Sequence, residues 1–135
     1  MIDMIEINNL GGSTAWDGFL KKIARIVLAK EKSKLILSVA LVNSYRIKEL
    51  NRKYRRKNRP TDVLSFQYGK EGEIVICLSE VRKNAKNFNS TFKKELKKVL
   101  IHGVLHLLGE NHEKTEKEAK KMQKKEEYYF KKIKF

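Results

Sequence analysis

The stretch from His102 to His112 constrains this chain strongly, because it specifies a helix, its end and a turn back toward it. All three histidines of the protein lie there, at positions 102, 106 and 112. Two residues four apart on a helix leave the same face one turn apart, so His102 and His106 can reach one ion. Gly109 can adopt the left-handed conformation that ends a helix, which would let the chain bring His112 to the same ion. The spacing therefore predicts a metal site at the end of one helix.

Three histidine nitrogens leave one position of a tetrahedral metal ion open. A structural site is usually closed by a fourth protein ligand, whereas an open position takes water and lowers its pKa to about 7. We therefore expect a single catalytic metal ion that serves hydrolysis, with a structural metal as the alternative. Three imidazoles favour zinc, although nickel, copper and cobalt accept the same ligands. A lone core histidine or a chance surface histidine would explain one of these residues but not all three.

The spacing of the histidines around Gly109 is that of the metzincin peptidases, but one residue departs from their pattern. Those enzymes carry a glutamate base directly after the first histidine, and this chain has Gly103 there. Glu110 follows the helix end and cannot take that role by spacing alone. A phosphodiester has an oxygen leaving group and depends more on positive charge near its non-bridging oxygens. Gly103 therefore favours a phosphate ester over a peptide as substrate.

The charge of the chain favours the same substrate class. Its 31 Lys and Arg against 16 Asp and Glu give a net charge of +15, which attracts polyanions. Eight of the sixteen residues from Tyr45 to Pro60 are Lys or Arg, and only Glu49 opposes them. Within this segment, the Arg55 guanidinium can grip phosphate oxygens in a fork, and the Tyr54 ring can stack on a base. We expect the segment to bind RNA, with a merely solvated basic surface as the alternative.

Length and composition predict one cytoplasmic domain over residues 1–135. The 135 residues, 41% of them hydrophobic, are enough for one core of modest size. No stretch approaches the roughly 18–20 apolar residues of a membrane span, and the first residues lack the pattern of a signal peptide. The single cysteine, Cys77, lies in an apolar run and cannot form an internal disulfide. We expect it to be buried, in a reducing compartment.

The hydrophobic pattern predicts an α+β fold of about four mostly short strands in one sheet, packed with four to five helices. The strands are expected over residues 2–8, 34–42, 63–66 and 73–78, and the last two are expected to form a hairpin around a turn at 68–72. Helices are expected to about residue 30, over 45–53, 79–88 and 91–108, and from 116 onward. The metal site would lie at the end of the central one.

Side-chain caps are predicted at four helix starts, from Ser13 or Thr14, Asn43 or Ser44, Ser79 and Thr115. The last helix has residues at helical spacing: Ala119, Met122, Glu126, Tyr129 and Ile133. Its many lysines and its glutamates, Glu126 among them, are interpreted as an ordinary charged face, and Met122 as a core residue.

Four segments resemble the YbeY family of bacterial rRNA maturation factors and endoribonucleases. The stretch from His102 to His112 looks like the signature of that family, and residues 50–66 are similar to its second block, which includes Pro60-Thr61-Asp62. Residues 72–76 and 118–122 match two weaker blocks. The resemblance extends from about Leu50 to Glu126, and the first fifty residues fit only in pattern.

The resemblance implies a zinc-dependent, single-strand-specific endoribonuclease that acts in 16S rRNA maturation and ribosome quality control. It implies association with the small ribosomal subunit and its assembly factors. Arg55 matches the functional arginine of the family, expected near the metal. The family usually has an acidic residue before the third histidine, where this chain has Asn111, which cannot act as a base. A metallopeptidase-like hydrolase and a non-catalytic assembly factor with a structural metal remain as alternatives.

Overall fold

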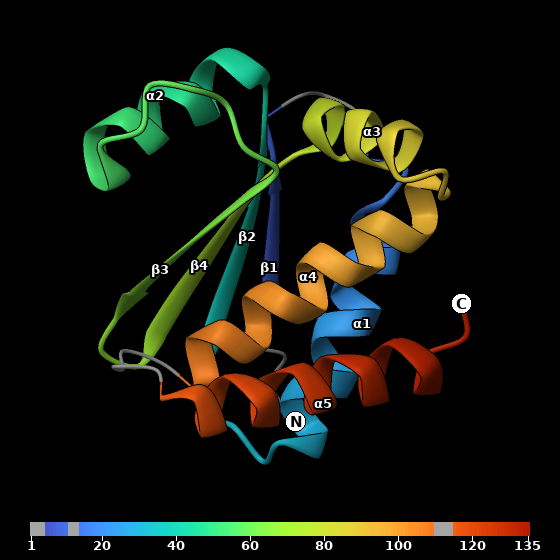
Figure 1. Cartoon of the computed structure of the whole chain (residues 1–135). Helices are drawn as coiled ribbons and strands as arrows, with labels where there is room; N and C mark the ends of the chain where they lie inside the picture. Colours follow the sequence, from blue (N-terminus) through green and yellow to red (C-terminus); the bar gives the residue numbers. More distant parts are fainter. Residues whose placement is uncertain (1–4, 11–13, 110–114) are drawn as a thin grey trace.

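The computed structural model describes residues 5–10, 14–109 and 115–135, which contain four strands and five helices. The strands are β1 (Ile5–Asn9), β2 (Ile36–Val42), β3 (Val63–Tyr68) and β4 (Glu71–Cys77). They form one sheet in the order β1-β2-β4-β3, in which only β3 pairs antiparallel to its neighbour (Figure 1). The predicted α+β class, with its single sheet, is confirmed.

The helices lie on both faces of this sheet. They are α1 (Asp17–Lys30), α2 (Ser44–Arg55), α3 (Leu78–Asn87), α4 (Phe92–Leu108) and α5 (Glu116–Lys132). Helix α2 covers one face, and α1, α3 and α4 lie on the other, where α5 packs on α4 (Figure 1). No described helix combines the length and hydrophobicity that a bilayer span requires.

Two hydrophobic cores follow from the alternation of side chains along the central strands. In β2 and β4, every second residue joins a large core with α1, α4 and α5, namely Leu37, Val39, Leu41, Ile74 and Ile76. The residues between them join a smaller core under α2, namely Ala40, Val42, Val75 and Cys77. Cys77 is fully buried, as the sequence predicted.

Helix α4 lies close to the sheet because one of its residues has no side chain. A Cβ atom at Gly103 would lie 3.1 Å from Cδ1 of Ile74 in β4. This contact, with the buried leucines and valines around Gly103, packs the second half of α4 onto the sheet. The histidine-bearing half of the helix is therefore fixed by the large core.

Two of the four predicted caps are wrong. Asn43 and Thr115 do accept hydrogen bonds, from the backbone N–H groups of Arg46 and Glu118. Helix α1, however, starts after Trp16 without a side-chain cap, so Thr14 does not cap it, and Ser13 lies outside the described residues. Helix α3 follows β4 directly, so Ser79 already lies within its first turn and its hydroxyl lies 3.2 Å from the Cys77 sulfur.

The predicted hairpin is confirmed, but its turn is shorter than expected. The antiparallel pairing of β3 and β4 continues to Tyr68 and Glu71, which leaves Gly69 and Lys70 as the turn. Gly69 has a φ of +63°, a left-handed conformation that glycine adopts without strain. This glycine lets the strands extend further than their apolar residues indicated.

Candidate metal centre on helix α4

His102 and His106 lie on one face of α4, as their spacing predicted. Their rings are stacked, with centroids 5.9 Å apart and planes inclined by 26°. The residues between them, 103 to 105, are buried, whereas His102 is exposed and His106 is half-buried. Two imidazoles on adjacent helical turns are a donor pair suited to zinc, so the residues present fit that ion.

The third predicted ligand, His112, lies outside the described residues, as do Glu110 and Asn111. Within the described ranges, no group of three or more His, Cys, Asp or Glu side chains is placed to hold a metal ion. His102 and His106 are therefore two members of an expected set of three, and His112 stays a prediction.

Gly109 ends α4, but not in the way the sequence suggested. Its φ is −91° and its ψ is 7°, so the predicted left-handed conformation is wrong. Its N–H instead completes the helix by donating to the Leu105 carbonyl at 2.8 Å. A Cβ atom at Gly109 would lie 3.2 Å from Cε of Met122 in α5. Glycine at this position therefore allows α5 to approach the end of α4 closely.

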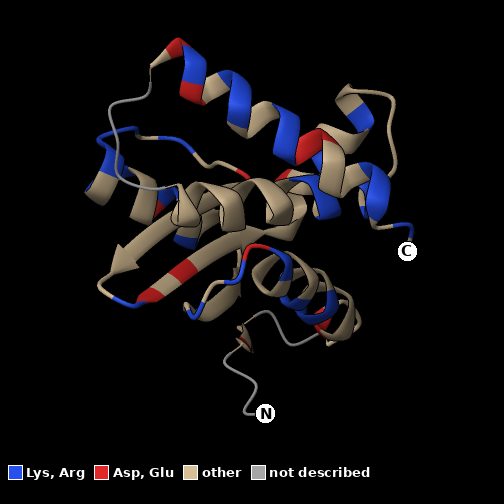
Figure 2. Cartoon of the chain, turned by 90° about the horizontal axis from the view of Figure 1, so that it is seen from below, with Lys and Arg blue, Asp and Glu red and all other residues tan. Residues whose placement is uncertain are grey.

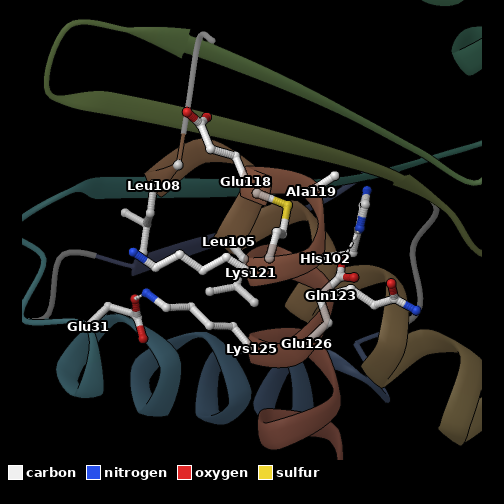
Figure 3. Close-up of a pocket in the computed structure, with 12 residues that line it drawn as sticks. Glu31, His102, Leu105, Leu108, Glu118, Ala119, Lys121, Gln123, Lys125 and Glu126 are labelled. Carbon is white, nitrogen blue, oxygen red and sulfur yellow. Dashed lines mark hydrogen bonds and ion pairs between the residues drawn. The ribbon is translucent and has the colours of Figure 1, made fainter. Parts of the chain in front are cut away.

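A carboxylate from α5 meets the first histidine. Nδ1 of His102 and Oε1 of Glu126 form a hydrogen bond, which the dashed line in Figure 3 marks. The Glu126 side chain is only 27% exposed, so its interpretation as part of an ordinary charged face is wrong. The signal was present in the sequence, because Glu126 occupies one position of the stripe whose next member, Tyr129, is buried.

Two pockets flank this histidine–glutamate contact. The first, of about 540 Å³, is lined by Met122 and Lys121 among others, and the second, of about 760 Å³, by Asp62 and Lys98 among others. His102, Gln123 and Glu126 line both pockets. Met122 is half-buried and lines the first pocket rather than being fully enclosed in the core.

Helix α5 is held beside the site by a carboxylate at the end of α1. Glu31 accepts hydrogen bonds from Nζ of Lys125 at 2.6 Å and from the Tyr129 hydroxyl at 2.5 Å. Burial alone raises the pKa of Glu31, but these two hydrogen bonds and the charge of Lys125 outweigh it and lower the pKa below its usual value. Burial, together with Glu31, raises the pKa of Tyr129 well above its usual value.

A second contact ties the end of α5 to α4. Nζ of Lys97 donates to the carbonyl of Ile133 at 2.6 Å and lies 4.4 Å from the centre of the Phe130 ring. Burial and the nearby charges of Lys93 and Lys94 lower the pKa of Lys97. The helix that supplies Glu126 is thus anchored at two places along its length.

Arg55 is the last residue of α2, which lies on the opposite face of the sheet from α4. Its guanidinium donates to the Ser65 carbonyl of β3 at 2.9 Å and lies 5.2 Å from the centre of the Phe66 ring. Among the described residues that line the two pockets beside His102, Arg55 is absent. The structure thus holds Arg55 on β3, and its proximity to the metal stays a prediction.

The charged side chains are spread unevenly over the fold. Lysines and arginines occur on every helix and on the loop after α2, whereas the second half of α4 carries no Lys, Arg, Asp or Glu (Figure 2). The loop is held in place because the buried Asn51 amide donates to the Arg59 carbonyl at 2.8 Å. This hydrogen bond fixes the course of the basic run 52–59 over the surface.

The chain is similar in sequence to known proteins over almost its whole length. The sequence model of the family described as Endoribonuclease YbeY matches residues 6–134. The chain is 42% identical over 134 residues to the endoribonuclease YbeY of Thermotoga maritima, covering 96% of this chain and 89% of that one. It is 44% identical over 115 residues to the endoribonuclease YbeY of Thermodesulfovibrio yellowstonii, covering 79% and 72%.

One solved structure supports the fold as well. The solution structure of a Thermotoga maritima protein, 40% identical in sequence, superposes with a TM-score of 0.73 and covers 94% of this chain and 87% of its own. The arrangement of sheet and helices described above is therefore shared with an experimentally determined structure.

Proposed function

Because this chain belongs to the endoribonuclease YbeY family, we propose that it cuts single-stranded RNA at a zinc ion held by His102, His106 and His112. The observation that carries the zinc proposal is the stacked pair of imidazoles on α4, 5.9 Å apart between ring centroids. The match to the family over residues 6–134 supports the endoribonuclease activity.

Zinc with an open coordination position supplies Lewis acidity and an activated water at neutral pH. The chain itself supplies binding and orientation. His102 and His106 are held by the rigid, core-packed half of α4, so their positions depend little on solvent-exposed loops. The Arg55 guanidinium, held on β3, would contact phosphoryl oxygens and stabilise the charge that develops on them. Gly103 supplies no carboxylate, which disfavours a peptidase.

We extend the proposal to the biological substrate. The net charge of +15 and the basic run around Arg55 suit a long polyanion, and ribosomal RNA of the small subunit is the substrate that the family resemblance implies. The small subunit and its assembly factors would then be its partners, and the cytoplasm its compartment. With Asn111 before the third histidine, no acid–base role is assigned to that position.

The test compares the parent protein with His106→Ala and Arg55→Ala on an RNA that contains both hairpins and single-stranded segments. We expect cleavage in the single-stranded segments by the parent, with a loss of at least about 100-fold in His106→Ala and in chelator-treated parent. Arg55→Ala should cut more slowly by about 10-fold or more, because a charge-assisted contact to the phosphoryl oxygens is lost. Readdition of zinc should restore the chelated parent but not His106→Ala.

Lys86→Ala is the matched control for Arg55→Ala, since it removes one exposed positive charge from α3, outside the basic segment around Arg55. It should cut like the parent. Equal cleavage by the parent, both variants and the chelated protein would indicate a contaminating nuclease. RNA binding without any cleavage by the purified parent would favour an assembly factor with a structural metal.

A further inference from the structure

We infer that Glu126 is a positioning residue of the metal centre, which holds His102 in the orientation needed to bind the ion. The inference deepens the proposed function and rests on it. Its basis is the hydrogen bond between Nδ1 of His102 and Oε1 of Glu126, which joins α4 to α5 (Figure 3).

The hydrogen-bonding properties of imidazole explain how this contact would orient His102 toward a metal ion. A neutral histidine has one nitrogen that carries a proton and one with a free lone pair. An ionised carboxylate only accepts hydrogen bonds, so beside Glu126 the proton sits on Nδ1 of His102. The lone pair is then on Nε2, and the carboxylate both fixes the ring and makes Nε2 a better donor to a cation.

The placement of Glu126 argues against a direct bond to the ion. Its oxygen is already hydrogen-bonded to Nδ1 of His102, which leaves Nε2, on the other side of the ring, for the ion. The carboxylate therefore acts through His102.

The carboxylate is also well fixed. Lys125, one residue before Glu126, and Tyr129, about one turn after it, both bind the Glu31 carboxylate at the end of α1. Beyond them, Ile133 is held by Lys97 of α4. Contacts before and after Glu126 thus hold this part of α5 beside α4, and the Glu126 side chain lies in a partly buried position where water screens it less.

The test measures zinc affinity rather than activity. The full-length parent, Glu126→Gln, Glu126→Ala and Glu127→Gln compete for zinc with a chromophoric chelator at neutral pH. We expect affinity to fall by about 10- to 100-fold in Glu126→Ala, as for other partners of metal-bound histidines. Glu126→Gln should fall less, because its amide oxygen still accepts from Nδ1. Glu127→Gln, the matched control on the exposed side of the same turn, should bind zinc like the parent.

Two further measurements separate this role from others. Thermal unfolding in chelator should be similar for the parent and Glu126→Gln, whereas the rise in Tm on adding zinc should be smaller in the variant. With Co²⁺ in place of zinc, the visible absorption should keep its tetrahedral intensity in Glu126→Gln. A change to a different coordination number would instead make Glu126 a direct ligand and overturn the inference.

Failure of this inference is distinguishable from failure of the proposed function. A parent that binds no zinc, or binds it as well after His106→Ala, would remove the metal centre itself. A parent whose zinc binding depends on His106 but is unchanged in both Glu126 variants would overturn the role of Glu126 alone.

Discussion

Gly103 combines a structural and a chemical role in a single residue. It allows α4 to contact Ile74, and it leaves empty the position where a metzincin peptidase carries its base. We predict that Gly103→Glu does not create a peptidase but unfolds the protein or lowers its free energy of unfolding by roughly 3 kcal/mol or more. A buried carboxylate would have to displace Ile74 at 3.1 Å and lose its hydration. Urea unfolding followed by circular dichroism measures this.

Gly18 provides the control for that substitution. It lies exposed in the first turn of α1, and a Cβ atom there would meet nothing within 4 Å. Gly18→Glu should leave the free energy of unfolding unchanged or raise it by up to about 1 kcal/mol, since a carboxylate at a helix N-terminus is favourable. A stable, peptide-cleaving Gly103→Glu protein would contradict both the packing argument and the choice of substrate.

Single residues also show where prediction from sequence reaches its limit. The pairing of His102 with His106 depends only on helical spacing, and the structure confirms it. The contact of His102 with Glu126 joins residues 24 apart on two helices, and nothing local indicates which carboxylate meets which ring. The left-handed conformation of Gly109 was predicted because helix-ending glycines usually adopt it, but here the close contact with Met122 explains the glycine.

At the scale of elements, the attachment of α5 to α1 should depend on pH. Glu31 has a lowered pKa in the folded protein, so the unfolded chain binds its proton more readily. The stabilisation is therefore complete above the pKa of the unfolded carboxyl, about 4.3, and is lost as the pH falls through the lower folded value. We predict that Glu31→Gln lowers the free energy of unfolding by about 1–2 kcal/mol at neutral pH.

Urea unfolding of the parent and Glu31→Gln over a series of pH values checks this. The difference between them should shrink in acid, where both side chains are uncharged. Glu49→Gln is the control, because Glu49 forms an exposed ion pair with Arg46 that should contribute at most about 0.5 kcal/mol. A difference that stays constant down to acid pH would show that the charge of Glu31 is not what stabilises α5.

The elements themselves were largely predictable because they follow local patterns. Loose alternation predicted the first strand, runs of apolar residues predicted the central strands, and helical periodicity predicted the helices to within a few residues at each end. The sheet order β1-β2-β4-β3 was not predictable in the same way, since parallel neighbours such as β1 and β2 are separated in the sequence by a whole helix. The predicted cap of α3 was wrong because β4 leads directly into this helix, so the last residue of the strand occupies the cap position.

For the whole molecule, the net charge of +15 predicts how RNA affinity responds to salt. Each phosphate contacted by a lysine or arginine should contribute about −0.7 to the slope of log affinity against log salt for a single strand. We predict a steep negative slope for the parent, and a slope less steep by about 0.7 for Arg55→Ala.

Fluorescence anisotropy of a labelled single-stranded RNA, in chelator to prevent cleavage, measures these slopes. Asn43→Ala, which changes the cap of α2 without changing charge, should keep the slope of the parent. An unchanged slope in Arg55→Ala would mean that Arg55 touches no phosphate and is held on Ser65 for packing alone.

The attachment of α5 also has a consequence for the order of synthesis. The N-terminus of a chain leaves the ribosome first, and the partners Glu31 and Tyr129 are 98 residues apart. A nascent chain that ends before α5 already carries both histidines of α4 but lacks the carboxylate that orients the first of them. With Glu126 in the role inferred above, the metal centre is complete only after α5 has been synthesised. Chains whose translation stops before α5 should therefore have little nuclease activity.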